Sequence, residues 1–210
     1  MIIIILLFLY ESILNIKSNI RRWIFHIYTI NLEYTFAYML LSEIQYFPPI
    51  TFFKSSYGQT HIYLSKYEIY RKMSFRNRCL VAGANGIISL SVPLERGRNQ
   101  RVPINEVRIS RSEHWQSRHL KSLCSAYNRS PFFEYYRDEL DLLFRKKFER
   151  LIDWDLECLN WIKEKLNWPP EIHLTEERVQ ETGDGLWRDH RNEILPKNRK
   201  EQNALIYHQV

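Results

Sequence analysis

The spacing of apolar residues predicts strands in the first half of the chain and helices in the second. From Leu40 to Phe47 an apolar and aromatic run ends at Pro48-Pro49, which removes two backbone donors and favours an extended conformation at Phe47. We therefore expect a strand here, followed by a rigid turn. Further strand-like runs occur at residues 61–64, 78–82, 87–92, 102–109 and 172–174.

Two of these runs, 78–82 and 87–92, flank the segment Gly83-Ala84-Asn85-Gly86. Asn-Gly supplies the positive φ that a tight hairpin turn requires, so the two runs are predicted to pair as a hairpin. The charged segment 95–100 is expected to form an exposed loop. The glycines are too few for a dinucleotide fingerprint, and no Lys-Ser/Thr follows them, which excludes a phosphate-binding loop of the known motifs.

After residue 110 the apolar residues recur at intervals of three and four, which is the spacing of helices buried on one side. Ser112 is expected to cap a first helix. Ser130-Pro131 is expected to begin a second helix, and Asp153 to cap a third that ends before Pro169-Pro170. Together the elements predict a mixed α/β fold, although an α+β arrangement also fits. Strands lie mainly in 40–109 and helices mainly in 112–168.

Residues 1–38 differ from the remainder, because they contain no Gly or Pro and begin with an apolar run. That run, residues 1–10, has about half the length needed to span a bilayer. We interpret 1–38 as an apolar extension produced by in-frame translation of an upstream region, with Met39 as the start. A membrane-surface segment is the alternative, and only this alternative would involve a membrane. Residues 39–210 are expected to form one domain.

The composition favours an anionic partner without identifying it. The 210 residues are 45% hydrophobic, which suffices for one domain, and 30 Lys and Arg against 24 Asp and Glu give a formal charge of +6. The three cysteines, Cys79, Cys124 and Cys158, are widely spaced, so they support neither a disulfide framework nor a structural zinc site. A reducing compartment fits this usage. The sequence identifies no cofactor.

Four cations lie within the nine residues 70–78, just before the predicted hairpin. If Phe75 to Arg78 is extended, Arg76 and Arg78 project to one face and Asn77 to the other. Two guanidinium groups on one face can bind phosphate or carboxylate in bidentate fashion, and Arg71 could assist. The alternative is a solvated basic edge strand that protects against edge-to-edge pairing.

Trp115, His119 and Ser122 share one face of the first predicted helix, at positions i, i+4 and i+7. An imidazole beside a hydroxyl could form an acid–base or nucleophile pair, so His119 and Ser122 are the candidate catalytic residues. A hydrogen-bonded core histidine is the alternative. His114 and His119 are five residues apart and no set of three ligands is evident, so no metal site is expected.

Several short motifs occur together in one order and spacing. They are Gln45-Tyr46-Phe47-Pro48-Pro49, Arg71 with Phe75-Arg76-Asn77-Arg78, Trp115 with His119-Leu120-Lys121-Ser122, Ala126-Tyr127, and Pro131-Phe132-Phe133-Glu134-Tyr135-Tyr136. Over roughly Met39 to Thr175 this set resembles the WbqC-like protein family. The resemblance implies a role in the biosynthesis of O-antigen and other surface polysaccharides in the bacterial cytoplasm, without assigning a reaction. Members usually continue past Val210, so we expect this chain to be truncated at its C-terminus.

The resemblance and the residues together suggest an enzyme, with transferase as the class considered, that acts on an anionic nucleotide-linked or acyl-donor substrate. Arg76 and Arg78 would bind the anion, and His119 would serve as the acid–base residue. The expected substrate-binding residues are Tyr46, Arg71, Arg76, Asn77, Arg78, Trp115 and Tyr127. The alternative is a noncatalytic partner of other pathway enzymes, docking through an aromatic cluster at 132–136. Nucleic-acid binding is disfavoured because the basic residues are scattered.

Overall fold

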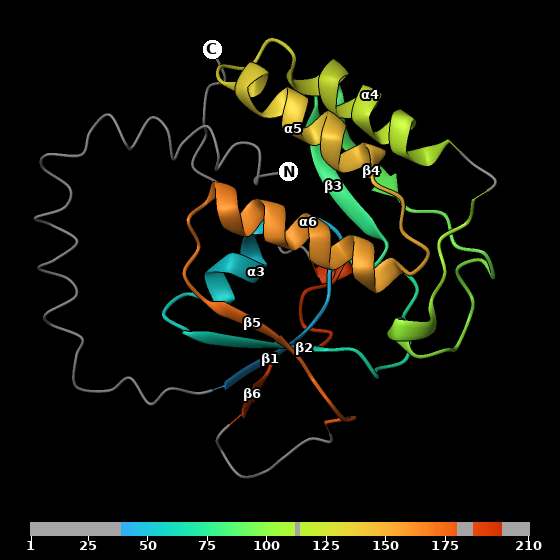
Figure 1. Ribbon diagram of the computed structural model, residues 1–210, viewed down its shortest axis with the longest axis vertical. Helices are drawn as coiled ribbons and strands as arrows, with labels where there is room; N and C mark the ends of the chain where they lie inside the picture. Colours follow the sequence, from blue (N-terminus) through green and yellow to red (C-terminus); the bar gives the residue numbers. More distant parts are fainter. Residues whose placement is uncertain (1–38, 112–113, 180–186, 199–210) are drawn as a thin grey trace, which may run out of the picture.

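Figure 1 shows the computed structural model, which describes residues 39–111, 114–179 and 187–198. The interpretation of residues 1–38, the capping role of Ser112 and the C-terminal end of the chain lie outside the described residues. Among the helices that the structure describes, none is both long enough and apolar enough to cross a membrane.

A four-stranded parallel sheet forms one layer of the molecule (Figure 1). Its strand order is β5-β2-β1-β6, and the strands are β1 (Met39–Glu43), β2 (His61–Ser65), β5 (Glu171–Leu174) and β6 (Trp187–Asp189). Parallel neighbours require a crossover connection. The connection from β1 to β2 contains the short helix α3 (Ile50–Ser55). Among the described residues, the other helices and a hairpin lie between β2 and β5, except for one turn of 3-10 helix after β6, η2 (Pro196–Asn198).

The hairpin and three longer helices form the remainder of the structure. Figure 1 shows α6 and α3 on the same side of the sheet, with the hairpin, α4 and α5 beyond them. These elements are β3 (Arg78–Gly83), β4 (Gly86–Ser91), the 3-10 turn η1 (Ile104–Glu106), α4 (Trp115–Tyr127), α5 (Phe133–Arg145) and α6 (Leu151–Lys165). Their apolar faces and those of β1 and β2 share one continuous core, so the mixed α/β prediction is confirmed.

The alternation along β2 determines which face of the sheet lies against this core. Ile62 and Leu64 are fully buried, whereas His61 is exposed and Tyr63 is half-buried. Successive side chains of a strand point to opposite faces. The face that carries Ile62 and Leu64 therefore packs on the helices, and the other face carries His61 and Tyr63.

The prediction for residues 40–47 is only half right. β1 ends at Glu43, and Phe47 has φ 43° instead of the extended conformation that usually precedes proline. Its ring packs into the core, with centroids 5.0 Å from Tyr46 and 6.1 Å from Phe144, and this packing offsets the backbone strain. The turn after it continues into α3, with Pro49 at the N-cap, because a helix start needs no backbone donor there.

The hairpin prediction is confirmed, and the required positive φ is found at Gly86, with φ 119°. The predicted strand at 102–109 is wrong. Its backbone instead packs on the loop after β2, where Tyr70 N donates to Val102 O at 2.9 Å and Ile104 N donates to Glu68 O at 2.9 Å. Pro103 cannot donate to a ladder, so isolated bridges and one 3-10 turn replace the strand.

All three predicted helices exist, but each begins elsewhere. His114 occupies the N-cap of α4, and Phe132, with φ 64°, occupies that of α5, two residues after Ser130. α6 begins before Asp153, whose carboxylate instead accepts hydrogen bonds from the Arg150 side chain. The strand at 172–174 is confirmed as β5, whereas β6 was not expected because it lies in the polar tail of the chain.

Candidate functional site

A cleft of about 680 Å³ opens where the parallel strands end. Its walls come from the loop after β2, the segment 98–101 of the loop after β4, Arg178 beyond β5, and the residues that end and follow β6. In open α/β sheets, ligands bind outside the carboxyl ends of the strands, where neighbouring connections leave in opposite directions. β1 and β6 are the neighbouring strands where the direction changes. The chain runs from β1 to β2 and β5 on one side of β1, whereas β6 is added on the other side.

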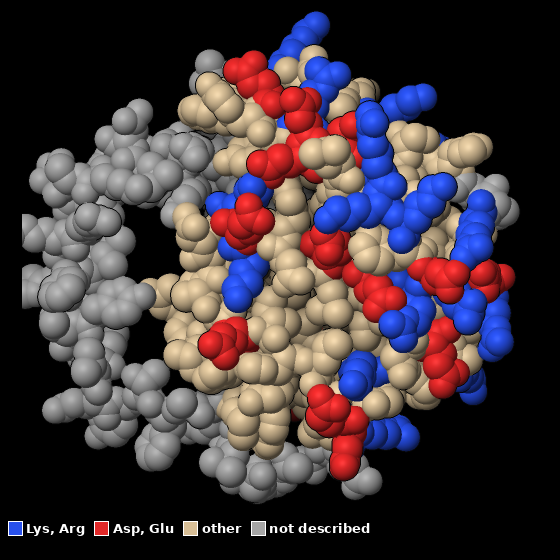
Figure 2. All heavy atoms as spheres, viewed as in Figure 1, with Lys and Arg blue, Asp and Glu red and all other residues tan. Residues whose placement is uncertain are grey.

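The walls of the cleft are strongly basic. Six cationic side chains line it against two carboxylates, Glu68 and Asp189. The six cations are Arg71, Lys72, Arg98, Arg101, Arg178 and Arg191. Within the described residues, only Arg191 of the six forms an ion pair with a carboxylate. Lys72 donates to Asn99 Oδ1 at 3.3 Å, and the four arginines without a carboxylate partner are Arg71, Arg98, Arg101 and Arg178. The face in Figure 2 shows basic and acidic side chains interspersed.

Arg191 is held in place at the end of β6. Its Nε donates to Asp189 Oδ1 at 3.0 Å, and its NH1 donates to the Val179 carbonyl at 3.0 Å. Burial alone would raise the pKa of Asp189, but the hydrogen bonds and charge of Arg191 outweigh this effect and lower it. Asp189 is therefore ionised, and the pair contributes no net charge to the cleft.

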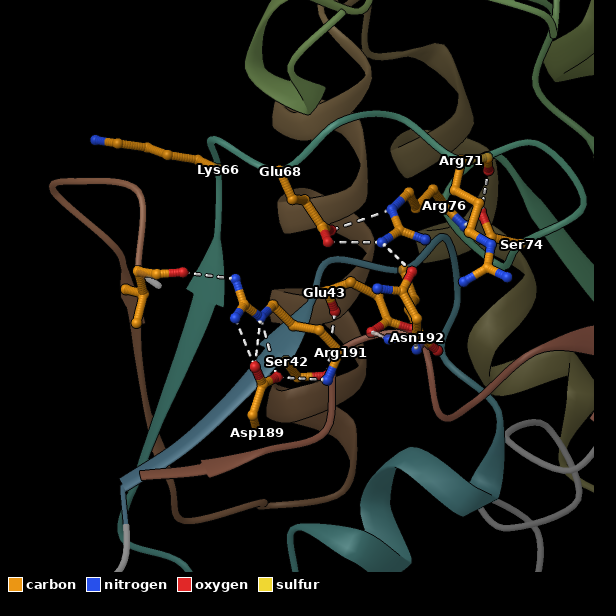
Figure 3. Close-up of polar contacts among 12 residues, drawn as sticks. Ser42, Glu43, Lys66, Glu68, Arg71, Ser74, Arg76, Asp189, Arg191 and Asn192 are labelled. Carbon is orange, nitrogen blue, oxygen red and sulfur yellow. Dashed lines mark hydrogen bonds and ion pairs between the residues drawn. The ribbon is translucent and has the colours of Figure 1, made fainter. Parts of the chain in front are cut away.

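A buried ion pair lies beneath the cleft (Figure 3). Arg76 is fully buried, and its NH2 and Nε contact the two oxygens of Glu68 at 2.7 and 3.1 Å. The same NH2 donates to Asn192 Oδ1 at 3.1 Å. The bidentate contact fixes Glu68, and the hydrogen bond fixes Asn192. Both residues line the cleft.

Glu43, the last residue of β1, adds a second carboxylate below the cleft. It accepts hydrogen bonds from Gln45 Nε2 at 2.9 Å and from the backbone N–H of Asn192 at 2.7 Å. Burial raises the pKa of Glu43, and the charge of Arg76 and the Asn192 hydrogen bond oppose this only in part. The polar layer of Glu43, Glu68, Arg76 and Asn192 thus joins β1 to the segment after β6.

The structure separates the four predicted anion-binding residues. Arg71 lines the cleft, on a turn held by a 2.6 Å hydrogen bond from Ser74 Oγ to the Arg71 carbonyl. The expectation that Arg76 and Arg78 share an exposed face is wrong, because β3 begins only at Arg78 and Arg76 is buried against Glu68. Asn77 accepts from Tyr70 Oη and donates to Val92 O, at 3.0 Å each.

The predicted pairing of His119 with Ser122 is not observed. The Ser122 hydroxyl donates to the Arg118 carbonyl at 2.9 Å, whereas His119 Nδ1 lies 2.9 Å from the Tyr46 hydroxyl. His119 is 6% exposed, and burial lowers its pKa to about 4. The imidazole is therefore a neutral, hydrogen-bonded core group, and its acid–base role stays a prediction.

The other predicted aromatic contacts are also in or near the core. Tyr46 is fully buried, and Tyr127, 3% exposed, accepts a hydrogen bond from the Ala82 backbone at 3.0 Å. Trp115, 5% exposed, lines a second cavity of about 860 Å³ bounded by α4, α5 and the start of α6. Both acidic and basic side chains line that cavity. Neither His119 nor any cation of residues 70–78 lines it.

Sequence reasoning missed most of the residues that form the cleft. Asp189, Arg191 and Asn192 lie in a polar segment with no periodic signal, and only the pairing of β6 with β1 brings them to the site. Glu43 did carry a signal, because a carboxylate inside the apolar run 40–47 must be either a break in the strand or a buried, partnered acid.

Comparison with models of protein families gives a match. The family model described as the WbqC-like protein family matches residues 44–202, which include every residue of the cleft and of the polar layer except Glu43. No curated protein matches this chain, and no solved structure matches it.

Proposed function

Since the chain belongs to the WbqC-like protein family, we propose that it acts in bacterial surface-polysaccharide biosynthesis of the O-antigen type and binds an anionic substrate in the basic cleft. Membership of this family supports the pathway, which is what the resemblance implies. The single observation that carries the substrate class is the set of four guanidinium groups that face one cleft without carboxylate partners among the described residues.

The chemistry shared by the two candidate substrates is a diphosphate. A nucleotide-linked sugar and an acyl-CoA donor both carry one, and planar guanidinium groups bind phosphate oxygens in bidentate fashion. The cleft also has the position expected for a diphosphate, at the carboxyl ends of parallel strands. Arg71 belongs to this set, whereas Arg76 is a positioning residue that fixes Glu68 and Asn192. The proposed activity is group transfer from the bound donor.

Thermal unfolding of the full chain tests the proposal. The midpoint is measured with pyrophosphate, nucleoside diphosphates, nucleotide-sugars and acyl-CoAs, because a ligand that binds the native state raises it. We expect one class to raise the midpoint, and the Arg98→Ala, Arg101→Ala double variant to lose most of that shift. The matched control is Arg129→Ala with Arg137→Ala, two exposed arginines outside the cleft, which should retain it. Equal loss in both double variants, or no shift with any of these anions, would contradict the proposal.

A noncatalytic partner of the pathway enzymes is the second candidate. Phe132, Tyr135 and Leu142 are 38%, 69% and 63% exposed, and Tyr135 and Leu142, seven residues apart, share one face of α5. Of the other two aromatic residues in the predicted cluster, Phe133 is buried, and Tyr136 is half-buried with its ring against Trp161. Co-purification with pathway enzymes that Tyr135→Ser abolishes, together with no turnover of any donor, would favour this candidate over the enzyme.

A further inference from the structure

Two imidazoles and one carboxylate come together at the end of the parallel sheet remote from the cleft. His61 is the first residue of β2, and Glu171, the first residue of β5, is its partner in the parallel register. His173 lies two residues beyond Glu171, on the same strand. Because alternate residues of a strand share a face, all three side chains project from the face of the sheet opposite the helices.

The three donor atoms form a compact triangle. His61 Nδ1 lies 3.1 Å from His173 Nε2, and Glu171 Oε2 lies 3.6 Å from each of these nitrogens. The centre of such a triangle is about 2.0 Å from all three atoms, which is the bond length of Zn²⁺ to a histidine nitrogen or a carboxylate oxygen. A zinc ion therefore fits among the three atoms without displacement of any of them.

Neighbouring aromatic rings restrict the orientation of the His173 ring. Tyr63 stacks on it with centroids 4.9 Å apart and an interplanar angle of 26°, and Trp187 packs edge-on against Tyr63 at 4.8 Å. A ligand held by its surroundings loses less freedom when a metal binds. The side chains of His61 and Glu171 are 49% and 68% exposed, so water can reach a fourth coordination position.

We propose that His61, Glu171 and His173 bind one Zn²⁺ ion, with water as the fourth ligand. Two imidazole nitrogens and one carboxylate oxygen suit zinc, whereas Mg²⁺ and Ca²⁺ prefer oxygen ligands alone. In the metal-free protein, one ring N–H donates to the other ring, which draws the two histidines together. The ion replaces this proton and joins the edge strand β5 to β2.

This site was not foreseen because its members lie far apart in the chain. His61 and His173 are separated by 112 residues, so no ligand spacing within one helix or loop can indicate them. None of the three lines the basic cleft, so the zinc proposal is independent of the proposed function.

Titration of the full chain, without an affinity tag and stripped of metal, tests the proposal. We expect one Zn²⁺ to bind per chain, and His61→Ala or His173→Ala to weaken binding by at least about 10- to 100-fold, the loss that removal of even an outer-shell partner causes. His114→Ala is the matched control, because His114 is an exposed histidine outside the cluster, and it should bind Zn²⁺ as the parent does. Mg²⁺ should not compete.

A second measurement separates ligand loss from misfolding. Zn²⁺ should raise the midpoint of thermal unfolding of the parent and of His114→Ala, but not of His173→Ala, whose own midpoint without metal reports whether it folds. Co²⁺ in place of Zn²⁺ should give the intense visible absorption of a four-coordinate site. Absence of stoichiometric binding, or binding that both His61→Ala and His173→Ala retain, would overturn the proposal.

Discussion

The hydroxyl of Tyr46 lies 2.9 Å from Nδ1 of His119, and this contact joins the segment after β1 to the middle of α4 across 73 residues. Both side chains are buried, and their rings stack with centroids 5.8 Å apart. Both were expected to contact substrate. Instead they form a polar contact inside the core, where hydrogen bonding determines whether the burial of a polar group is tolerated.

Replacement of Tyr46 by phenylalanine should destabilise the fold while leaving its packing almost unchanged. The substitution leaves Nδ1 of His119 buried without its partner, at an expected cost of about 1–3 kcal/mol in the free energy of unfolding. Urea denaturation measures this difference. Tyr135→Phe is the control, because Tyr135 is 69% exposed, and its effect should stay within about 0.5 kcal/mol. Equal effects of the two substitutions would show that the contact contributes nothing.

His119 should make the protein less stable in mild acid. Its folded-state pKa is about 4, because burial disfavours the charged form, whereas an unfolded histidine has a pKa near 6.5. Between these values the unfolded chain binds more protons, so the free energy of unfolding falls as the pH drops from about 6.5 to 4, by roughly 3 kcal/mol. Urea denaturation across this range should show that the free energy of unfolding changes with pH, and that it changes less in His119→Gln. An identical slope in both proteins would contradict the prediction.

Asp155 should have the opposite effect on the pH profile. Its carboxyl, in the first half of α6, is fully buried, and within the described residues neither oxygen has a hydrogen-bond partner. Burial raises its pKa far above the ordinary value, and the nearby charge of Arg76 only partly opposes this. A group whose pKa is higher in the folded state stabilises the fold at low pH, and this contribution to the free energy of unfolding is lost as the pH rises. Asp155→Asn should therefore lose less stability than the parent between mild acid and neutral pH, as measured by urea denaturation.

Replacement of Arg76 by alanine should damage the fold before it affects any ligand. The guanidinium is fully buried against Glu68, and its charge also acts on Glu43 and Asp155. Removal of one member of a buried pair costs about 3–5 kcal/mol, because the other charge remains without compensation. Denaturation with guanidinium chloride tests this in Arg76→Ala, Glu68→Ala and the double variant. The double variant should lose clearly less than the sum of the two single losses, and additive losses would contradict the pairing.

Anion binding in the cleft should weaken as salt is added. The four arginines without carboxylate partners are exposed, and ions in solution screen charges at exposed positions. Calorimetric titration with pyrophosphate at low and high sodium chloride should show a lower affinity at high salt in the parent. The affinity of the Arg98→Ala, Arg101→Ala variant should depend less on the salt concentration than that of the parent. A salt-independent affinity would indicate that the anion binds elsewhere.

The elements predicted correctly are those whose signal is local. The helices and the hairpin carry their own periodicity or turn residues, whereas Trp187–Asp189 forms a strand only because β1 offers it a partner. The same limit applies to the candidate site. Spacing identified Arg71, but it could not show that Glu68 turns back onto Arg76 and buries it.

The position of β1 inside the sheet has a consequence for biosynthesis. One edge of β1 pairs with β2 soon after both emerge from the ribosome, but the other edge must wait for β6, which lies far beyond β2 in the sequence. Until then an apolar strand exposes unpaired backbone groups, which favours aggregation. Completion of the sheet is thus a late step of high contact order, and nascent chains that stop before Trp187 should depend most on chaperones.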